Sequence, residues 1–235
     1  MTGTLLNTGS IILGSFIGIL FGSRIPERFR NTILSGLGLF TMAFGVSQFL
    51  KSQNIIYALG GLLIGAVLGE WWHIENGLQN LGIWLEKKLK PDHQSSADSR
   101  FVNGLLTASL LFCIGPLAIL GSIQDGLTGD YQTLMVKAVI DGFASMAFAS
   151  TLGVGVAFSA FFVLLYQGGI SILAAQVQML VTNEMMAEMT AVGGLILIGI
   201  TISSMLELRK IRVGNFLPGL IIAPVLVALV KLISG

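Results

Sequence analysis

The sequence contains eight stretches of about 20 mostly apolar residues, separated by short polar or glycine- and proline-marked breaks. A helix of this length crosses the roughly 30 Å hydrocarbon core of a bilayer, because each residue adds about 1.5 Å. The sequence therefore predicts an all-α, polytopic membrane protein with about eight spans in a single transmembrane domain, 1–235. The predicted spans cover residues 4–22, 32–50, 54–72, 102–123, 132–150, 154–174, 189–207 and 213–233.

The composition agrees with a membrane protein and excludes several function classes. Of the 235 residues, 54% are hydrophobic and 11% are charged, whereas about 25% of the residues of a soluble domain are charged. The net charge of +1 provides no field that would attract nucleic acid. The only cysteine, Cys113, and the two histidines, His73 and His93, exclude a disulfide framework and a thiolate-rich or His-rich metal site. We expect the lipid bilayer as a partner, and no metal, cofactor or nucleic acid.

The basic residues predict the orientation of the spans. If the loops alternate between two sides, ten basic residues fall on one side, and only Lys51 and Lys231 fall on the other. Because cytoplasmic loops carry the excess of Lys and Arg, the ten-residue side is cytoplasmic and both termini are periplasmic or extracellular. The ten residues are Arg24, Arg28, Arg30, Lys87, Lys88, Lys90, Arg100, Arg209, Lys210 and Arg212.

The longest connection is predicted to have two parts. Leucines and an isoleucine recur at three- and four-residue spacing over residues 74–89, with charged residues between them, which is typical of a helix in the cytoplasmic interface. Residues 90–100 are polar and are predicted to form a flexible linker, which divides the chain into a three-span and a five-span part.

Internal similarity indicates a repeat, and two pairings remain open. Residues 5–20 match residues 105–120. Further along the chain, Gly38 and Gly60 match Gly142 and Gly168, and the number of residues between the matched positions increases slowly. Such matches would form an inverted three-span repeat, as in many secondary transporters. A competing pairing matches Gly9, Arg28 and Asn31 with Gly193, Arg212 and Asn215 in the same orientation.

Small residues recur at every fourth position in two predicted spans. They form one strip of Ser10, Gly14, Gly18 and Gly22 and a second strip of Gly61, Gly65 and Gly69. Such strips let helices approach closely in lipid, so they predict packing within one subunit or across a homo-oligomer. A pore-lining role is the alternative.

Asp141 is the one acidic residue that lies clearly deep in a predicted span. Counted from Tyr131, it lies about 15 Å into the bilayer, close to the midplane. Lys137 lies one turn shallower on the same helix face, and Ser145 lies one turn deeper. Ionisable groups at this depth are usually functional, which favours a binding site for a polar or ionic solute. The alternative is an ion pair that only fixes helix packing.

Two further features are predicted at similar depth. Gly115 and Pro116 would kink or break the fourth span, because proline lacks the N–H that a helix needs and clashes with the preceding turn. Gln167 precedes two glycines in the sixth span. Together with Asp141, these residues predict a midplane polar site built from discontinuous helices. An ordinary proline kink is the alternative.

Polar and acidic residues are also predicted at the outer edge: Asn7, Asp125, Glu184 and Glu188. The two glutamates are four residues apart, and no cation lies at a helical spacing that would join them, so the group could gather cations at an entrance. The alternative is solvated loop charges. No G-x-S-x-G, phosphate-binding loop or H-E-x-x-H motif occurs, so we expect no catalytic residues and no enzyme activity.

Several segments resemble the YqgA/YdfK-like family of bacterial inner-membrane proteins. They include Leu6–Gly14, Gly115–Asp130, Lys137–Gly142, Tyr166–Gly168 and Asn215–Pro218, and the likeness covers nearly the whole chain. The resemblance implies a protein of the bacterial plasma (inner) membrane, in a family of unknown function that is often described as a candidate transport family. It implies no substrate and no site.

Two functions are therefore compared. The leading hypothesis is a secondary transporter or channel for a small polar or ionic solute, which moves through the midplane site. The alternative is a non-transporting scaffold or signalling partner that works through its glycine-strip helices and its cytoplasmic interfacial helix.

The charge distribution makes the topology testable by cysteine labelling from the periplasm. A cysteine replacing Ser95 or Lys210 should be protected from a membrane-impermeant thiol reagent, and one replacing Thr128 or Glu184 should react. Labelling at residue 95 in intact cells would contradict this topology.

Overall fold

The computed structural model describes residues 1–22, 26–89 and 99–234, and within these residues it contains helices and no strand. This confirms the all-α prediction. The α-helices are α1 (Thr2–Gly22), α2 (Glu27–Phe49), α3 (Ile55–Trp71), α4 (Ile74–Leu89), α5 (Arg100–Cys113), α6 (Pro116–Thr128), α7 (Gln132–Leu152), α8 (Gly155–Ile172), α9 (Ala174–Leu180), α10 (Asn183–Ile200) and α11 (Gly219–Ser234). A π-helical turn, Thr201–Met205, follows α10, and a short 3-10 turn, Val213–Phe216, precedes α11.

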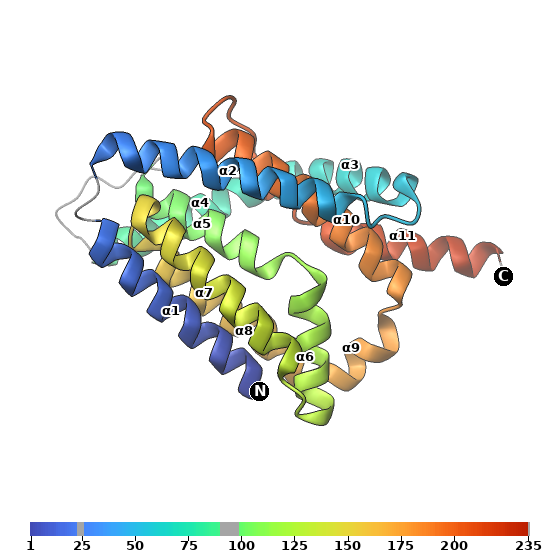
Figure 1. Ribbon diagram of the computed structural model, residues 1–235. Helices are drawn as coiled ribbons and strands as arrows, with labels where there is room; N and C mark the ends of the chain where they lie inside the picture. Colours follow the sequence, from blue (N-terminus) through green and yellow to red (C-terminus); the bar gives the residue numbers. More distant parts are fainter. Residues whose placement is uncertain (23–25, 90–98, 235) are drawn as a thin grey trace. The chain divides into compact units, whose positions relative to one another are not determined.

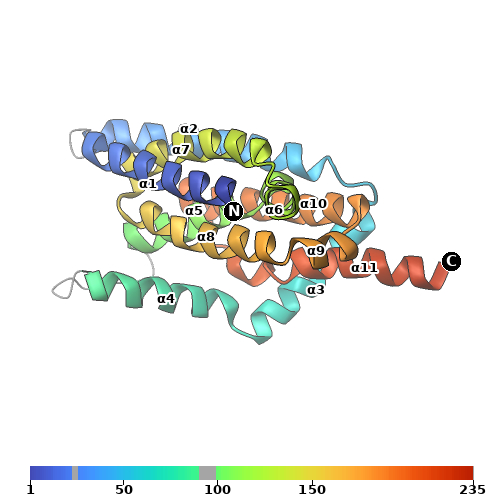
Figure 2. The same ribbon diagram turned by 90° about the horizontal axis from the view of Figure 1, so that it is seen from below.

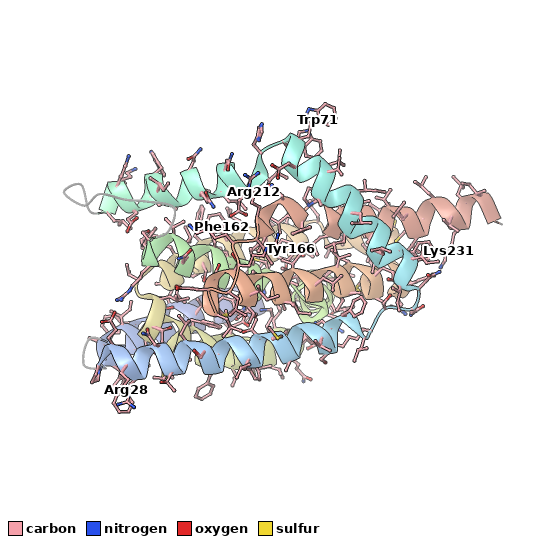
Figure 3. All side chains as sticks on the ribbon, turned by 90° about the horizontal axis from the view of Figure 1, so that it is seen from above. Arg28, Trp71, Phe162, Tyr166, Arg212 and Lys231 are labelled. Atoms are coloured by element: carbon pink, nitrogen blue, oxygen red, sulfur yellow. The ribbon has the colours of Figure 1, made fainter. Side chains whose placement is uncertain are left out.

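Six helical segments of the described chain are individually long and apolar enough to cross a membrane, and two bent helix pairs raise the number to as many as eight. One pair is α3 with α4, which meet at 60°, and the bend is visible in Figure 2. Trp71, at the end of α3, projects outward at this corner and is 75% exposed (Figure 3). The other pair is α5 with α6, which meet at 62° (Figure 1). The predicted number of eight therefore lies at the upper end of the range.

Helices α3 and α4 cover the residues of the predicted third span and the predicted interfacial helix. Asn54 begins α3 as its N-cap, and its side chain accepts a hydrogen bond from the backbone N–H of Ile56. The position of α4 relative to the bilayer stays a prediction. Of the predicted linker, residues 90–98 lie outside the described residues, while Ser99 and Arg100 belong to the start of α5, where Ser99 is the N-cap.

The chain path between α5 and α6 depends on two residues. Gly115 has φ of 144°, a backbone conformation that residues with a side chain rarely adopt. Pro116 is then the first residue of α6, where the missing N–H is no loss and the fixed φ of proline suits a helix. The predicted fourth span is therefore formed by two helices.

The chain divides into two compact units. Unit 1 contains residues 1–37 and 79–179, and unit 2 contains residues 38–78 and 180–235. Each unit combines chain from both sides of the predicted linker, so the units do not coincide with the three-span and five-span parts. In unit 1, α1 lies beside α7 (Figure 1) and also contacts α8, while α5 and α6 pack on α8. In unit 2, α11 packs against α3 and α10. The internal repeat stays a prediction.

Both glycine strips pack inside their own units. A methyl group added to Gly14, Gly18 or Gly22 would collide with backbone oxygens of α7, those of Gly142, Met146 and Ser150. In unit 2, methyl groups on Gly61, Gly65 and Gly69 would collide with Ala223, Gly219 and Asn215. The strips are therefore used for helix packing within the chain. A homo-oligomer stays a prediction that these surfaces do not support.

This packing predicts that bulk at Gly18 destabilises unit 1. Gly18→Leu would force α1 away from the Met146 backbone, and we expect a loss of about 1–3 kcal/mol in folding stability. Gly9→Leu is the matched control on the same helix, because no atom lies within 4 Å of a methyl group added there. The measurement is the thermal denaturation midpoint in detergent. Equal midpoints for the two variants would contradict the close α1–α7 contact.

Candidate functional site

A buried ion pair lies on α7. Lys137 and Asp141 are one helical turn apart, and these residues are only 5% and 6% exposed. The Nζ atom of Lys137 donates to Oδ2 of Asp141. The four-residue spacing places both side chains on one face of the helix, so each charge neutralises the other.

Two amide side chains from other helices complete the arrangement. Asn7 of α1 and Gln167 of α8 are both fully buried. The Nδ2 group of Asn7 donates to Oδ2 of Asp141 at 3.0 Å and to Oε1 of Gln167 at 3.3 Å. These four residues, Asn7, Lys137, Asp141 and Gln167, are called the buried polar cluster below. It joins α1, α7 and α8 within unit 1.

The buried polar cluster contains two polar atoms that lack a hydrogen-bond partner. They are Oδ1 of Asn7, which can accept, and Nε2 of Gln167, which can donate. Leaving such a group buried and unpaired costs about 1–3 kcal/mol. Native proteins usually satisfy these groups with water or a ligand. The cluster therefore has unused hydrogen-bonding capacity of both kinds.

The end of α5 lies next to the cluster. The Nζ atom of Lys137 is 6.0 Å from the ring centre of Phe112, which is almost fully buried. Phe112 precedes the turn at Gly115 that separates α5 from α6. The last turn of α5 is thus brought close to the ion pair.

Ser145 lies one turn deeper on α7 and is fully buried. Its hydroxyl donates to the backbone oxygen of Gly142 at 2.8 Å, within its own helix. A methyl group added to Gly14 would collide with this hydroxyl, which shows how closely α1 passes. Ser145 therefore lines the α1–α7 contact below the cluster.

The residues predicted at the outer edge occur in separate places. Asn7 belongs to the buried polar cluster. Asp125 of α6 is buried, and its Oδ2 accepts hydrogen bonds from the backbone N–H groups of Gly3 and Thr4 at 3.0 and 3.4 Å. This carboxylate therefore sits at the start of α1, where the helix dipole favours a negative charge.

The two glutamates lie in unit 2, and each has its own partners. Glu184 forms an ion pair with Lys231 of α11, which is labelled in Figure 3. Glu188 is fully buried and accepts hydrogen bonds from the Ser52 hydroxyl at 2.7 Å and from the N–H groups of Gln53 and Asn54 at 2.7 and 2.8 Å. Glu188 therefore ties the start of α3 to α10.

Sequence patterns did not reveal the contact of Asn7 with Asp141 or the contact of Glu188 with the start of α3. Asn7 is one of several polar residues near the start of an apolar stretch, and Asp141 lies 134 residues away. Glu188 is likewise 134–136 residues from its three donors. Among the described residues, no group of three or more His, Cys, Asp or Glu side chains is placed to hold a metal ion.

The ion pair predicts a non-additive effect on stability. Lys137→Ala leaves the Asp141 carboxylate buried without its cation, so we expect a loss of about 3–5 kcal/mol. The double variant Lys137→Ala/Asp141→Asn should be more stable than Lys137→Ala, because it removes the stranded charge.

Lys231→Ala serves as the control for that experiment. Its ion pair with Glu184 is formed by a lysine side chain that is 55% exposed, so we expect a loss of about 1 kcal/mol or less. All variants are compared by thermal denaturation in detergent. A double variant less stable than Lys137→Ala would show that Asp141 is not stabilised mainly by Lys137.

The comparisons with known proteins agree with the membrane architecture. The model of the family described as "Protein of unknown function (DUF554)" matches residues 2–228. "Uncharacterized membrane protein YdfK" of Bacillus subtilis (strain 168) is 32% identical over 231 residues, which cover 97% of this chain and 96% of that protein. "Uncharacterized protein YqgA" of Escherichia coli (strain K12) is 30% identical over 221 residues, 94% of each chain. No solved structure matches. The chain is therefore a membrane protein that belongs to the DUF554 family, as its resemblance to YqgA and YdfK indicated.

Proposed function

We propose that the chain is a secondary transporter or channel for a small polar or ionic solute, and that the buried polar cluster is the binding site. The observation that carries this proposal is the pair of unpaired atoms, Oδ1 of Asn7 and Nε2 of Gln167, beside a buried ion pair. A solute that supplied the missing hydrogen bonds would remove their cost.

The interruption between α5 and α6 beside the cluster is typical of a site that opens alternately to the two sides of the membrane. Transporter sites commonly lie near the midplane at the ends of interrupted helices. Here α5 ends beside the cluster, and α6 begins after Gly115. As the site opens, its hydration changes, and this alters how well Lys137 and water stabilise the Asp141 carboxylate. Binding of a proton or cation at Asp141 would then be coupled to movement of the solute.

The proposed setting is the bacterial inner membrane, with both termini in the periplasm. The basic residues of the loops support this orientation. In that orientation Asn7 lies nearer the periplasmic end of α1. We propose solute movement, not catalysis, as the role of the cluster.

The scaffold alternative has less support. It assigned partner binding to the glycine strips, but α7 covers one strip, and α11 with the 3-10 turn before it covers the other. The interfacial helix α4 is also partly occupied: Gly82 packs on Val102, and Glu86 accepts a hydrogen bond from Ser99. No specific observation favours a partner protein.

The test replaces Asp141 with asparagine in protein reconstituted into liposomes. Uptake of ions, amino acids, polyamines and small uncharged amides is screened first, with and without a proton or sodium gradient. We expect Asp141→Asn to abolish gradient-coupled uptake while folding is retained, because the amide preserves the shape and removes the titratable charge.

Asp130→Asn is the matched control for this experiment. The Asp130 carboxylate is exposed and accepts a hydrogen bond from the Gln132 N–H at the start of α7, so its amide should leave uptake unchanged. Normal coupled uptake by Asp141→Asn would show that the carboxylate is a packing element, and the coupling role would have to be abandoned.

A further inference from the structure

The helices around the buried polar cluster contain few charges. In α1, α5, α6, α7 and α8 the sequence has four charged side chains: Arg100, Asp125, Lys137 and Asp141. Arg100 pairs with Glu27 and is largely exposed. Asp125 accepts from the N–H groups at the start of α1. Lys137 and Asp141 neutralise each other, so the cluster has no net charge.

The hydrogen bonds of the cluster leave one acceptor and one donor without a partner. Two carboxamides can form a reciprocal pair with two hydrogen bonds, in which each N–H faces the other oxygen. Asn7 and Gln167 form only one of these bonds, and Nδ2 of Asn7 also donates to Asp141. The second pair of atoms, Oδ1 of Asn7 and Nε2 of Gln167, is left open as one acceptor and one donor.

A ligand that satisfies both atoms would donate one hydrogen bond to Oδ1 of Asn7 and accept one from Nε2 of Gln167. It must also add no charge, because an extra charge deep in a membrane protein costs several kcal/mol unless it is paired. Both charged groups of the cluster already have partners.

We propose that the cluster binds a solute of the carboxamide or urea type, which has no net charge and presents a donor beside an acceptor. The carbonyl oxygen of the solute accepts from Nε2 of Gln167, and its N–H donates to Oδ1 of Asn7. This inference rests on the proposed function, since it names the class of solute for the same site. A single ordered water could make the same two bonds, so the test must separate the two.

The test uses pairs of probes with nearly equal shape and different charge. Acetamide is compared with acetate, and urea with guanidinium, in swelling assays on liposomes that contain the reconstituted protein. We expect acetamide and urea to enter faster than they enter empty liposomes, and acetate and guanidinium to show no such increase.

Gln167→Glu then changes the charge of the site at constant shape. The carboxylate removes the donor and gives the cluster a net negative charge. We expect protein-dependent uptake of acetamide and urea to fall about tenfold or more, and guanidinium uptake to appear. Gln124→Glu is the matched control, because Gln124 is an exposed residue of α6 and the same substitution there should leave all four rates unchanged.

A second measurement does not depend on the folding of a variant. Acetamide and urea at millimolar concentration should raise the thermal denaturation midpoint of the native protein in detergent, and acetate and guanidinium should not. Absence of any shift, together with no protein-dependent swelling, would mean that no such solute binds to the two unpaired amide atoms and would overturn the inference. Entry of acetate or guanidinium in place of acetamide and urea would also overturn it, while the Asp141→Asn experiment would still decide the proposed function separately.

Discussion

The close contact between α1 and α7 is the interaction on which the candidate site depends. Packed helices are commonly 8–10 Å apart, at a distance set by the side chains between them. Here the glycines of α1 rest directly on backbone oxygens of α7. The short side chain of Asn7 therefore reaches Asp141. A larger residue at Gly14 or Gly18 would separate the helices and withdraw the amide from the carboxylate. The glycine strip and the polar cluster are thus parts of one arrangement.

Unit 2 uses a similar combination of features. Its glycine helix, α3, packs on α11, and the N–H groups at its start are bound by the buried carboxylate of Glu188. In unit 1, Asp125 binds the N–H groups at the start of α1 in the same way. A carboxylate at this end satisfies donors that a helix leaves unpaired and interacts favourably with its dipole. Small residues let two helices approach closely but do not fix the position of one along the other. The carboxylate fixes that position, because it binds the N–H groups at the start of the helix.

The two units differ in the bonding around their buried charged side chains. In unit 2, Glu188 has three donors and Glu184 has a cation. In unit 1, the ion pair is neutral, but an amide oxygen and an amide nitrogen beside it have no partner. In a low-dielectric interior a fully bonded polar group stabilises the fold, whereas a half-bonded one is costly. This difference is why the transport proposal rests on the cluster in unit 1 and assigns a structural role to Glu188.

The sequence by itself determined the all-helical class, the long apolar helices and the position of Asp141 one turn from Lys137, because apolar length and helical spacing are local properties of the chain. It also placed two strips of small residues, but not the surfaces that they contact. Only the tertiary structure decided that α7 and α11 cover these strips, that Asn7 joins Asp141, and that Glu188 binds the start of α3. These partners are more than 100 residues apart in the chain, and apolar helices of similar composition offer no periodicity that distinguishes one neighbour from another. Which polar atoms stay unpaired follows from those contacts, so it could be known only after the helices were placed.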